Sequence, residues 1–178
     1  MVSLWCTRKL LRRLGIPPKT ATPPPTTVLG DWYANLYYTR PHQLVLCLNE
    51  RTLLAVLIPA LDADSLGFRF CDAARALLVR LGVPPAAVDA EARAMADVAF
   101  GPTANRRVLG CLNEAANVVS LELESGRRTS TTDLELFLSE NIYALTGYRE
   151  PRQLVLDLFA NSGTSSGRFV SGVHQDTL

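Results

Sequence analysis

Polar side chains gather along one side of the segment between residues 103 and 124. A helical projection at about 100° per residue places them in a narrow stripe, with apolar side chains opposite. We therefore expect an amphipathic helix with one face in the core and one face free to hydrogen-bond a partner. The polar stripe comprises Arg106, Gly110, Asn113, Asn117, Ser120 and Glu124, and the apolar face comprises Val108, Leu109, Leu112, Ala115, Ala116, Val119 and Leu123.

Several of these residues have a structural explanation beside the functional one. Thr103 and Asn105 are of types that accept a hydrogen bond from the first turn of a helix, so either fits an N-cap. Gly110 in mid-helix costs ~1 kcal/mol relative to Ala, which indicates close approach by another backbone or by a ligand. Asn113 is a poor helix former, so a specific hydrogen bond is expected there.

Arg106 is predicted to be functional. A cation at the start of a helix is mildly unfavourable with respect to the helix dipole, so helix stability alone favours an acid at this position. The structural alternative is a buried ion pair with Asp31.

A second group of candidate residues lies near the amino terminus. Residues 1–30 contain no acid, and four cations occupy the polar side of a predicted helix: Arg8, Lys9, Arg12 and Arg13. These cations would attract the phosphate backbone of a nucleic acid without recognising its base sequence. The alternative is a surface helix whose long cations are simply solvated.

Two further motifs add polar residues. In LGDWYANL (29–36), Asp31 is placed to present a carboxylate beside an aromatic platform, although Trp at a strand start is more often a core anchor. NERTL (49–53) supplies an amide and a guanidinium. The candidate binding residues are Asp31, Trp32, Asn35, Asn49, Arg51, Thr103, Asn105, Arg106 and Asn113.

Metal and cofactor chemistry have little support. The four cysteines, Cys6, Cys47, Cys71 and Cys111, are scattered without a C-x-x-C pair, so buried reduced thiols are expected. His42 falls in a predicted turn and His174 in the tail, which leaves few ligands for zinc. We expect no metal and no cofactor.

The composition fits a single globular domain. The chain has 178 residues, 48% of them hydrophobic, and a formal net charge of +1. No apolar run approaches the ~18 residues that span a bilayer, and no secretory signal is evident. A soluble protein without a membrane partner is expected, with the cytoplasm as the default location.

Periodicity predicts an α+β fold in which a small antiparallel sheet packs against the helix that begins near Thr103. The sheet consists of a three-strand meander (Trp32–Tyr38, Gln43–Leu48, Thr52–Ile58) joined by short strands near Val2–Cys6 and at 98–100, with a turn at Thr39–His42 and an extended loop at Thr20–Thr27. Four to six helices are expected, among them Arg8–Leu14, Ser65–Leu81, Pro85–Met95, Thr132–Tyr143 and Pro151–Phe159.

Four motifs together are similar to an uncharacterised family of bacterial domains of unknown function: CTRKLL (6–11), LGDWYANL, NERTL and TANRRVLGCLNE (103–114). The resemblance implies an independent domain over residues 1–125, of a kind carried on mobile elements, and no established activity. Residues 126–160 are expected to be a helical extension of the same domain, and residues 161–178, rich in Gly and Ser, a disordered tail.

The last motif departs from the family pattern, T-x-N-R-S-V-L-G-S-M-N-D. The departures are Arg107, Cys111, Leu112 and Glu114, where the family has Ser, Ser, Met and Asp. The departures at Arg107 and Cys111 therefore argue against any role that requires the two hydroxyl groups, whereas Glu114 keeps the carboxylate.

The favoured function is a binding module that contacts nucleic acid or a partner protein through the polar stripe and the basic helix, with Trp32, Tyr33, Tyr37 and Tyr38 as stacking aromatics. One alternative is a hydrolase or nuclease-like toxin that uses Asp31 or Glu114 as base and Arg106 to stabilise an anion, but histidine and a placed nucleophile are missing. Another is an antitoxin-like or purely structural partner protein. A small-molecule ligand stays open.

Overall fold

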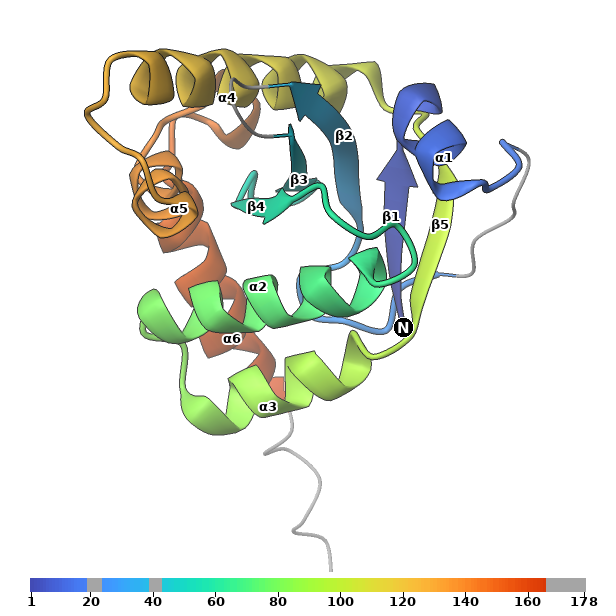
Figure 1. The fold of residues 1–178 in the computed structure, drawn as a ribbon. Helices are drawn as coiled ribbons and strands as arrows, with labels where there is room; N and C mark the ends of the chain where they lie inside the picture. The colour runs from blue at the N-terminus through green and yellow to red at the C-terminus, as the bar shows by residue number, and fades with distance from the viewer. Residues whose placement is uncertain (19–23, 39–42, 166–178) are drawn as a thin grey trace, which may run out of the picture.

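The computed structural model describes residues 1–18, 24–38 and 43–165. Its strands form one mixed sheet in the order β4-β3-β2-β1-β5 (Figure 1). The predicted turn at Thr39–His42 and part of the loop at Thr20–Thr27 lie outside the described residues. The strands are β1 (Val2–Cys6), β2 (Trp32–Tyr38), β3 (Gln43–Asn49), β4 (Ala55–Pro59) and β5 (Val98–Pro102).

The predicted antiparallel meander is confirmed, but the sheet as a whole is mixed. β3 pairs antiparallel with both β2 and β4, whereas β1 pairs in parallel with both β2 and β5. The expectation of a purely antiparallel sheet is therefore wrong. Both parallel neighbours of β1 are reached through helical crossovers, which parallel pairing requires: α1 (Arg8–Leu14) leads to β2, while α2 (Leu66–Arg80) and α3 (Pro85–Ala94) lead from β4 to β5.

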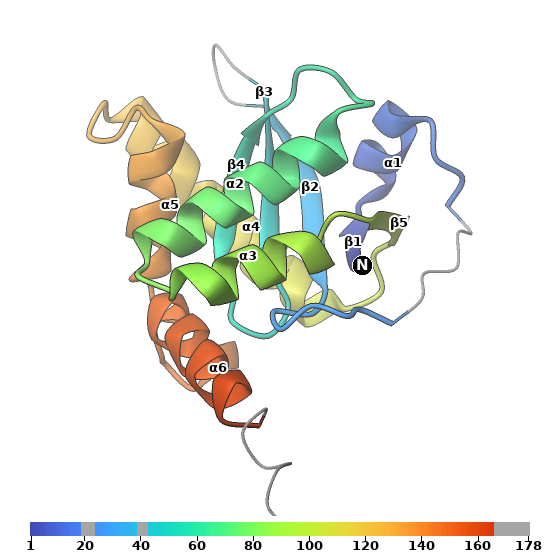
Figure 2. The same ribbon diagram turned by 90° about the horizontal axis from the view of Figure 1, so that it is seen from below.

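Helices cover both faces of the sheet. One core lies beneath α1, α2, α3 and α6 (Pro151–Ser165), and the other beneath α4 (Arg106–Glu124) and α5 (Thr131–Ser139). Figure 2 shows α1, α2 and α3 in front of the sheet and α4 behind it. The predicted packing of the 103–124 segment on the sheet is confirmed, because Val108, Leu112 and Ala116 are buried.

The carboxyl-terminal helices are part of both cores. Leu134 and Leu138 of α5 pack with α4, while Val155 and Phe159 of α6 pack on the opposite face. α5 ends at Ser139, earlier than predicted, and a short 3-10 helix η1 (Ala144–Thr146) follows. α6 runs to Ser165, so residues 161–165 are helical and not part of a tail.

Candidate functional site

The polar stripe of α4 faces solvent. Arg106, Gly110, Asn113, Asn117 and Glu124 are exposed. A Cβ on Gly110 would meet no described atom within 4 Å, so the close approach predicted there by another element of this chain is absent from the described structure. The stripe is available to a partner, and its glycine is unused by the fold.

Asn105 fixes the start of α4 in two ways. Its Oδ1 accepts hydrogen bonds from the backbone N–H groups of Arg107 (3.0 Å) and Val108 (3.4 Å), the role of an N-cap. Its Nδ2 donates to Glu50 Oε1 at 2.9 Å, which ties the helix to the β3–β4 turn. Beside this link, burial and the neighbouring Glu50 charge raise the pKa of Tyr33 to about 12, so its phenol stays protonated at neutral pH.

Both the amide nitrogen and the amide oxygen of the Asn49 side chain form hydrogen bonds within the fold. Its side chain is fully buried, and its Nδ2 donates to the carbonyl oxygens of Leu29 and Asp31. Its Oδ1 accepts from the backbone N–H of Arg51 and from both the N–H and the hydroxyl of Thr52. This network is closed, so Asn49 offers no free group to a ligand.

Arg51 and Asp31 flank this network at the surface. Arg51 Nη1 donates to the Val28 carbonyl at 2.9 Å, and its Cδ lies 3.3 Å from the position a Cβ would take on Gly30, which has a left-handed φ of +73°. Asp31 is half-buried, and its Oδ1 has no hydrogen-bond partner among the described residues. Arg106 forms no ion pair with Asp31 in the described structure, so the structural alternative for Arg106 has no support.

Two of the four predicted stacking aromatics are internal, and the side chain of a third, Tyr38, lies outside what the structure describes. Trp32 is fully buried and meets Phe70 edge-on, with ring centroids 5.2 Å apart. Tyr33 is 4% exposed on the opposite face of the sheet, and Tyr37 is half-buried. Trp32 and Tyr33 therefore act as core anchors.

The four cations of α1 are all exposed, while Leu10 and Leu11 face the core. Among the described residues, no ion pair involves Arg8, Arg12 or Arg13. The helix contains no acid, so its solvent face is purely cationic. Arg106 and Arg107 are also exposed, but α4 lies on the other face of the sheet from α1 (Figure 2).

α1 and α4 both start from neighbouring parallel strands. β1 leads directly into α1 and β5 leads into α4, and the Thr103 N–H donates to the Cys6 carbonyl at 3.1 Å where the two strands end. In open α/β sheets, ligands bind outside the carboxyl ends of strands whose connections leave for opposite faces. Half-buried polar residues gather at this point, where the Thr7 hydroxyl donates to Asn35 Oδ1 at 2.7 Å.

The candidate binding residues therefore do not form one site but lie at three separate locations. Asn49, Arg51, Asp31 and Asn105 meet at the β3–β4 turn, mostly in structural hydrogen bonds. Asn35 of β2 lies beside the carboxyl end of β1, and Thr103 directly follows β5. Exposed cations and amides lie on α1 and α4: Arg8, Lys9, Arg12, Arg13, Arg106 and Asn113.

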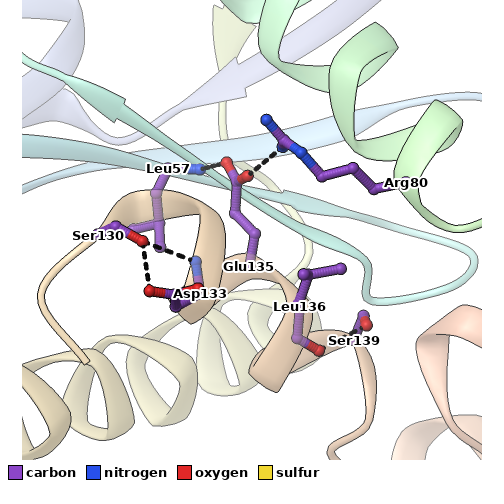
Figure 3. Close-up of polar contacts among 7 residues, drawn as sticks. All are labelled: Leu57, Arg80, Ser130, Asp133, Glu135, Leu136 and Ser139. Atoms are coloured by element: carbon purple, nitrogen blue, oxygen red, sulfur yellow. Dashed lines mark hydrogen bonds and ion pairs between the residues drawn. The ribbon is translucent and has the colours of Figure 1, made fainter. Parts of the chain in front are cut away.

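Sequence reasoning missed the buried carboxylates. Glu91 accepts hydrogen bonds from the N–H groups of Val28 and Leu29, and Glu122 pairs with Arg127 and Arg128. Glu135 of α5 reaches the sheet edge (Figure 3). An acid between apolar neighbours, as in Leu134–Leu138, is the signal that marks such a group.

The cysteine expectation is confirmed for most positions, since all four are free and three are buried. Burial raises the pKa of the Cys6 thiol to about 12. Within the described residues, no three His, Cys, Asp or Glu side chains are grouped to hold a metal ion. No helix in the described part of the chain is long and apolar enough to cross a membrane.

Together these features define an α+β domain with a mixed five-stranded sheet, an acid-free cationic first helix and an exposed polar stripe on α4. The chain belongs to the DUF6933 family (domain of unknown function), which matches residues 3–154. The predicted membership of a family of unknown function is confirmed, and the match extends past residue 125 into the carboxyl-terminal helices. No curated protein matches the chain.

Proposed function

We propose that this protein is a non-enzymatic binding module that contacts the phosphate backbone of nucleic acid through α1. The observation that carries the proposal is the cationic face of that helix, which comprises Arg8, Lys9, Arg12 and Arg13 without a single acid. Exposed surface cations are usually balanced by nearby acids. Here Arg8, Arg12 and Arg13 form no ion pair within the described structure, although Asp62 lines the same hollow as Arg13, so phosphates would meet exposed cations.

Burial of the aromatic residues limits the mode of binding. Trp32 and Tyr33 are too deeply buried to stack on bases, so the proposed contact uses the cations of α1 and is with the backbone, independent of sequence. The same observation supports a second candidate, an acidic protein surface, because such a surface also needs only complementary charge.

An enzymatic role has weaker support. Arg106 and Glu114 lie eight residues apart on one helix, which corresponds to about 12 Å along the axis. Within the described residues, Asp31 forms no ion pair with Arg106, and its Oδ1 has no hydrogen-bond partner. A base and an anion-stabilising cation acting on one substrate would need to lie closer together.

The proposal includes the cellular setting that the family resemblance implies. We expect a bacterial protein carried on mobile elements. Its default location is the cytoplasm, where nucleic acid is an abundant polyanion.

The test compares two variants that each lose four positive charges. R8A/K9A/R12A/R13A removes the α1 cations and leaves the buried Leu10 and Leu11 in place. The matched control, R75A/R93A/R149A/R152A, removes one arginine each from α2, α3, the segment before α6, and α6 itself. Binding of labelled RNA and DNA is measured by fluorescence anisotropy over a salt series.

We expect the α1 variant to lose at least about tenfold in affinity and to show a flatter salt dependence, because each lost phosphate contact removes about 0.9 from the slope for a duplex. The control should bind nearly as the parent does. If both variants lose the same affinity for nucleic acid, the loss depends only on net charge. That result would overturn the assignment of the interface to α1. Weakening by R106A/R107A would extend the interface to the start of α4.

A further inference from the structure

β4 forms one edge of the sheet, and two of its outward-facing backbone groups have partners within the chain. The Leu54 carbonyl accepts from Asn49 N–H, and Ala60 N–H donates to the Gln43 carbonyl. In an antiparallel pair, residues alternate between inward and outward hydrogen bonding. The N–H of Leu57 therefore points outward, and it donates to Glu135 Oε1 at 2.9 Å.

The next outward position along β4 is also closed. Pro59 has no N–H to offer an added strand, and its carbonyl accepts a hydrogen bond from Arg69. Open sheet edges pair with other chains unless they are covered or charged. Glu135 and Arg69 thus occupy two of the hydrogen-bonding positions that a sixth strand would use.

Glu135 joins three elements through one carboxylate. It projects from α5, accepts from β4, and lies with its Oε2 3.6 Å from Arg80 Nη1 of α2 (Figure 3). Its exposed fraction is 3%, yet it lines a groove of about 370 Å³ between α2, α5 and β4. Water and protons can therefore reach a side chain that is otherwise buried.

We propose that the Glu135 carboxyl is a pH-sensitive latch that holds α5 against the β4 edge. The groups that face it are Arg80, Arg69 and Asp72 from α2, which share its groove, and the Cys47 thiol from β3. β4 itself contributes no ionisable side chain. Protonation of Glu135 weakens the attraction of Arg80 but removes a buried charge.

Linkage gives the direction in which the latch works. Burial raises the pKa of Glu135 from 4.5 to about 7, against the lowering effects of the Leu57 hydrogen bond and of Arg80. When α5 opens, the carboxyl returns to water and to its ordinary pKa. The closed state therefore binds the proton more tightly, so closing is most favourable near pH 5 and weakens as the pH rises toward 7.

The test is hydrogen exchange of the Leu57 amide, followed by NMR between about pH 5 and pH 7.5 and corrected for the intrinsic exchange rate. Because burial raises the pKa of Glu135 from 4.5 to about 7, its protection should fall on the order of a hundredfold over this range. In E135Q, which keeps an oxygen for Leu57 but cannot ionise, protection should not change with pH. E140Q, an exposed glutamate on the turn after α5, is the matched control and should follow the parent.

R80M provides a second variant. Without the guanidinium that favours the carboxylate, the midpoint of the Leu57 profile should move to higher pH. The latch is disproved by a pH profile that is the same in the parent and E135Q. It is also disproved if Leu57 exchanges only as slowly as the central amides of β3, since opening would then be global unfolding and not release of α5.

Discussion

At the scale of single residues, Asn49 is the side chain most completely used by the fold. N49A should cost about 2–4 kcal/mol of unfolding free energy, because it leaves several buried donors and acceptors without partners. Urea denaturation measures this value. N113A, on the exposed face of α4, is the control and should change stability by less than about 0.5 kcal/mol. A stable N49A protein would mean that the turn has another support.

Arg106 is expected to behave in the opposite way. It is exposed and has no ion pair in the described structure, so R106A should alter the unfolding free energy by no more than about 0.5 kcal/mol. Destabilisation by about 2 kcal/mol or more would reveal a buried charge pair and remove the functional interpretation.

Gly110 gives a test of the polar stripe. No described atom of the chain requires a glycine there, so G110A should stabilise the protein by about 0.5–1 kcal/mol in thermal or urea unfolding. If the glycine serves a partner that approaches the helix backbone, the same variant will bind that partner less well. A destabilised G110A protein would mean that an unseen contact fills this space.

Residue types predicted contacts within a few residues of the chain better than contacts between distant segments. The cap at Asn105 followed from the type and position of one residue. The network of Asn49 did not, because its partners Leu29 and Asp31 lie about twenty residues away, on a strand connection that periodicity does not place. For Trp32 the sequence allowed both a stacking role and a role as a core anchor. Its complete burial shows that it is a core anchor.

At the scale of elements, alternation and capping predicted most helices and strands but not every strand direction. α1 was predicted with its observed ends, since Gly15 and the following prolines stop it. The parallel pairing of β1 depends on where two crossovers return to the sheet. That choice is made by packing of whole helices, and the strand pattern itself carries no sign of it.

Burial distinguishes the structural from the exposed positions of these helices. L134A removes a side chain that is 1% exposed in α5 and should cost about 2–4 kcal/mol. L121A removes the same atoms from α4, where Leu121 is 61% exposed, and should cost less than about 0.5 kcal/mol. Equal costs in thermal unfolding would mean that α5 is not part of the core.

For the molecule as a whole, the positions of the charged side chains say more about a binding partner than the net charge does. A net charge of +1 predicts nothing about a polyanion, but an acid-free first helix on the surface does. The cationic character of this helix could be predicted from the sequence because acids are missing from residues 1–30. It could not show that α1 and the start of α4 lie on opposite faces of the sheet.

The salt dependence of nucleic acid binding by the unmodified protein tests the central proposal most directly. The association constants for a labelled duplex and a labelled single strand are measured from low to physiological ionic strength. If the four α1 cations contact phosphates, the logarithm of the duplex constant should fall with the logarithm of salt with a slope of roughly −4. The absence of salt-sensitive binding to either RNA or DNA at low ionic strength would contradict the proposal.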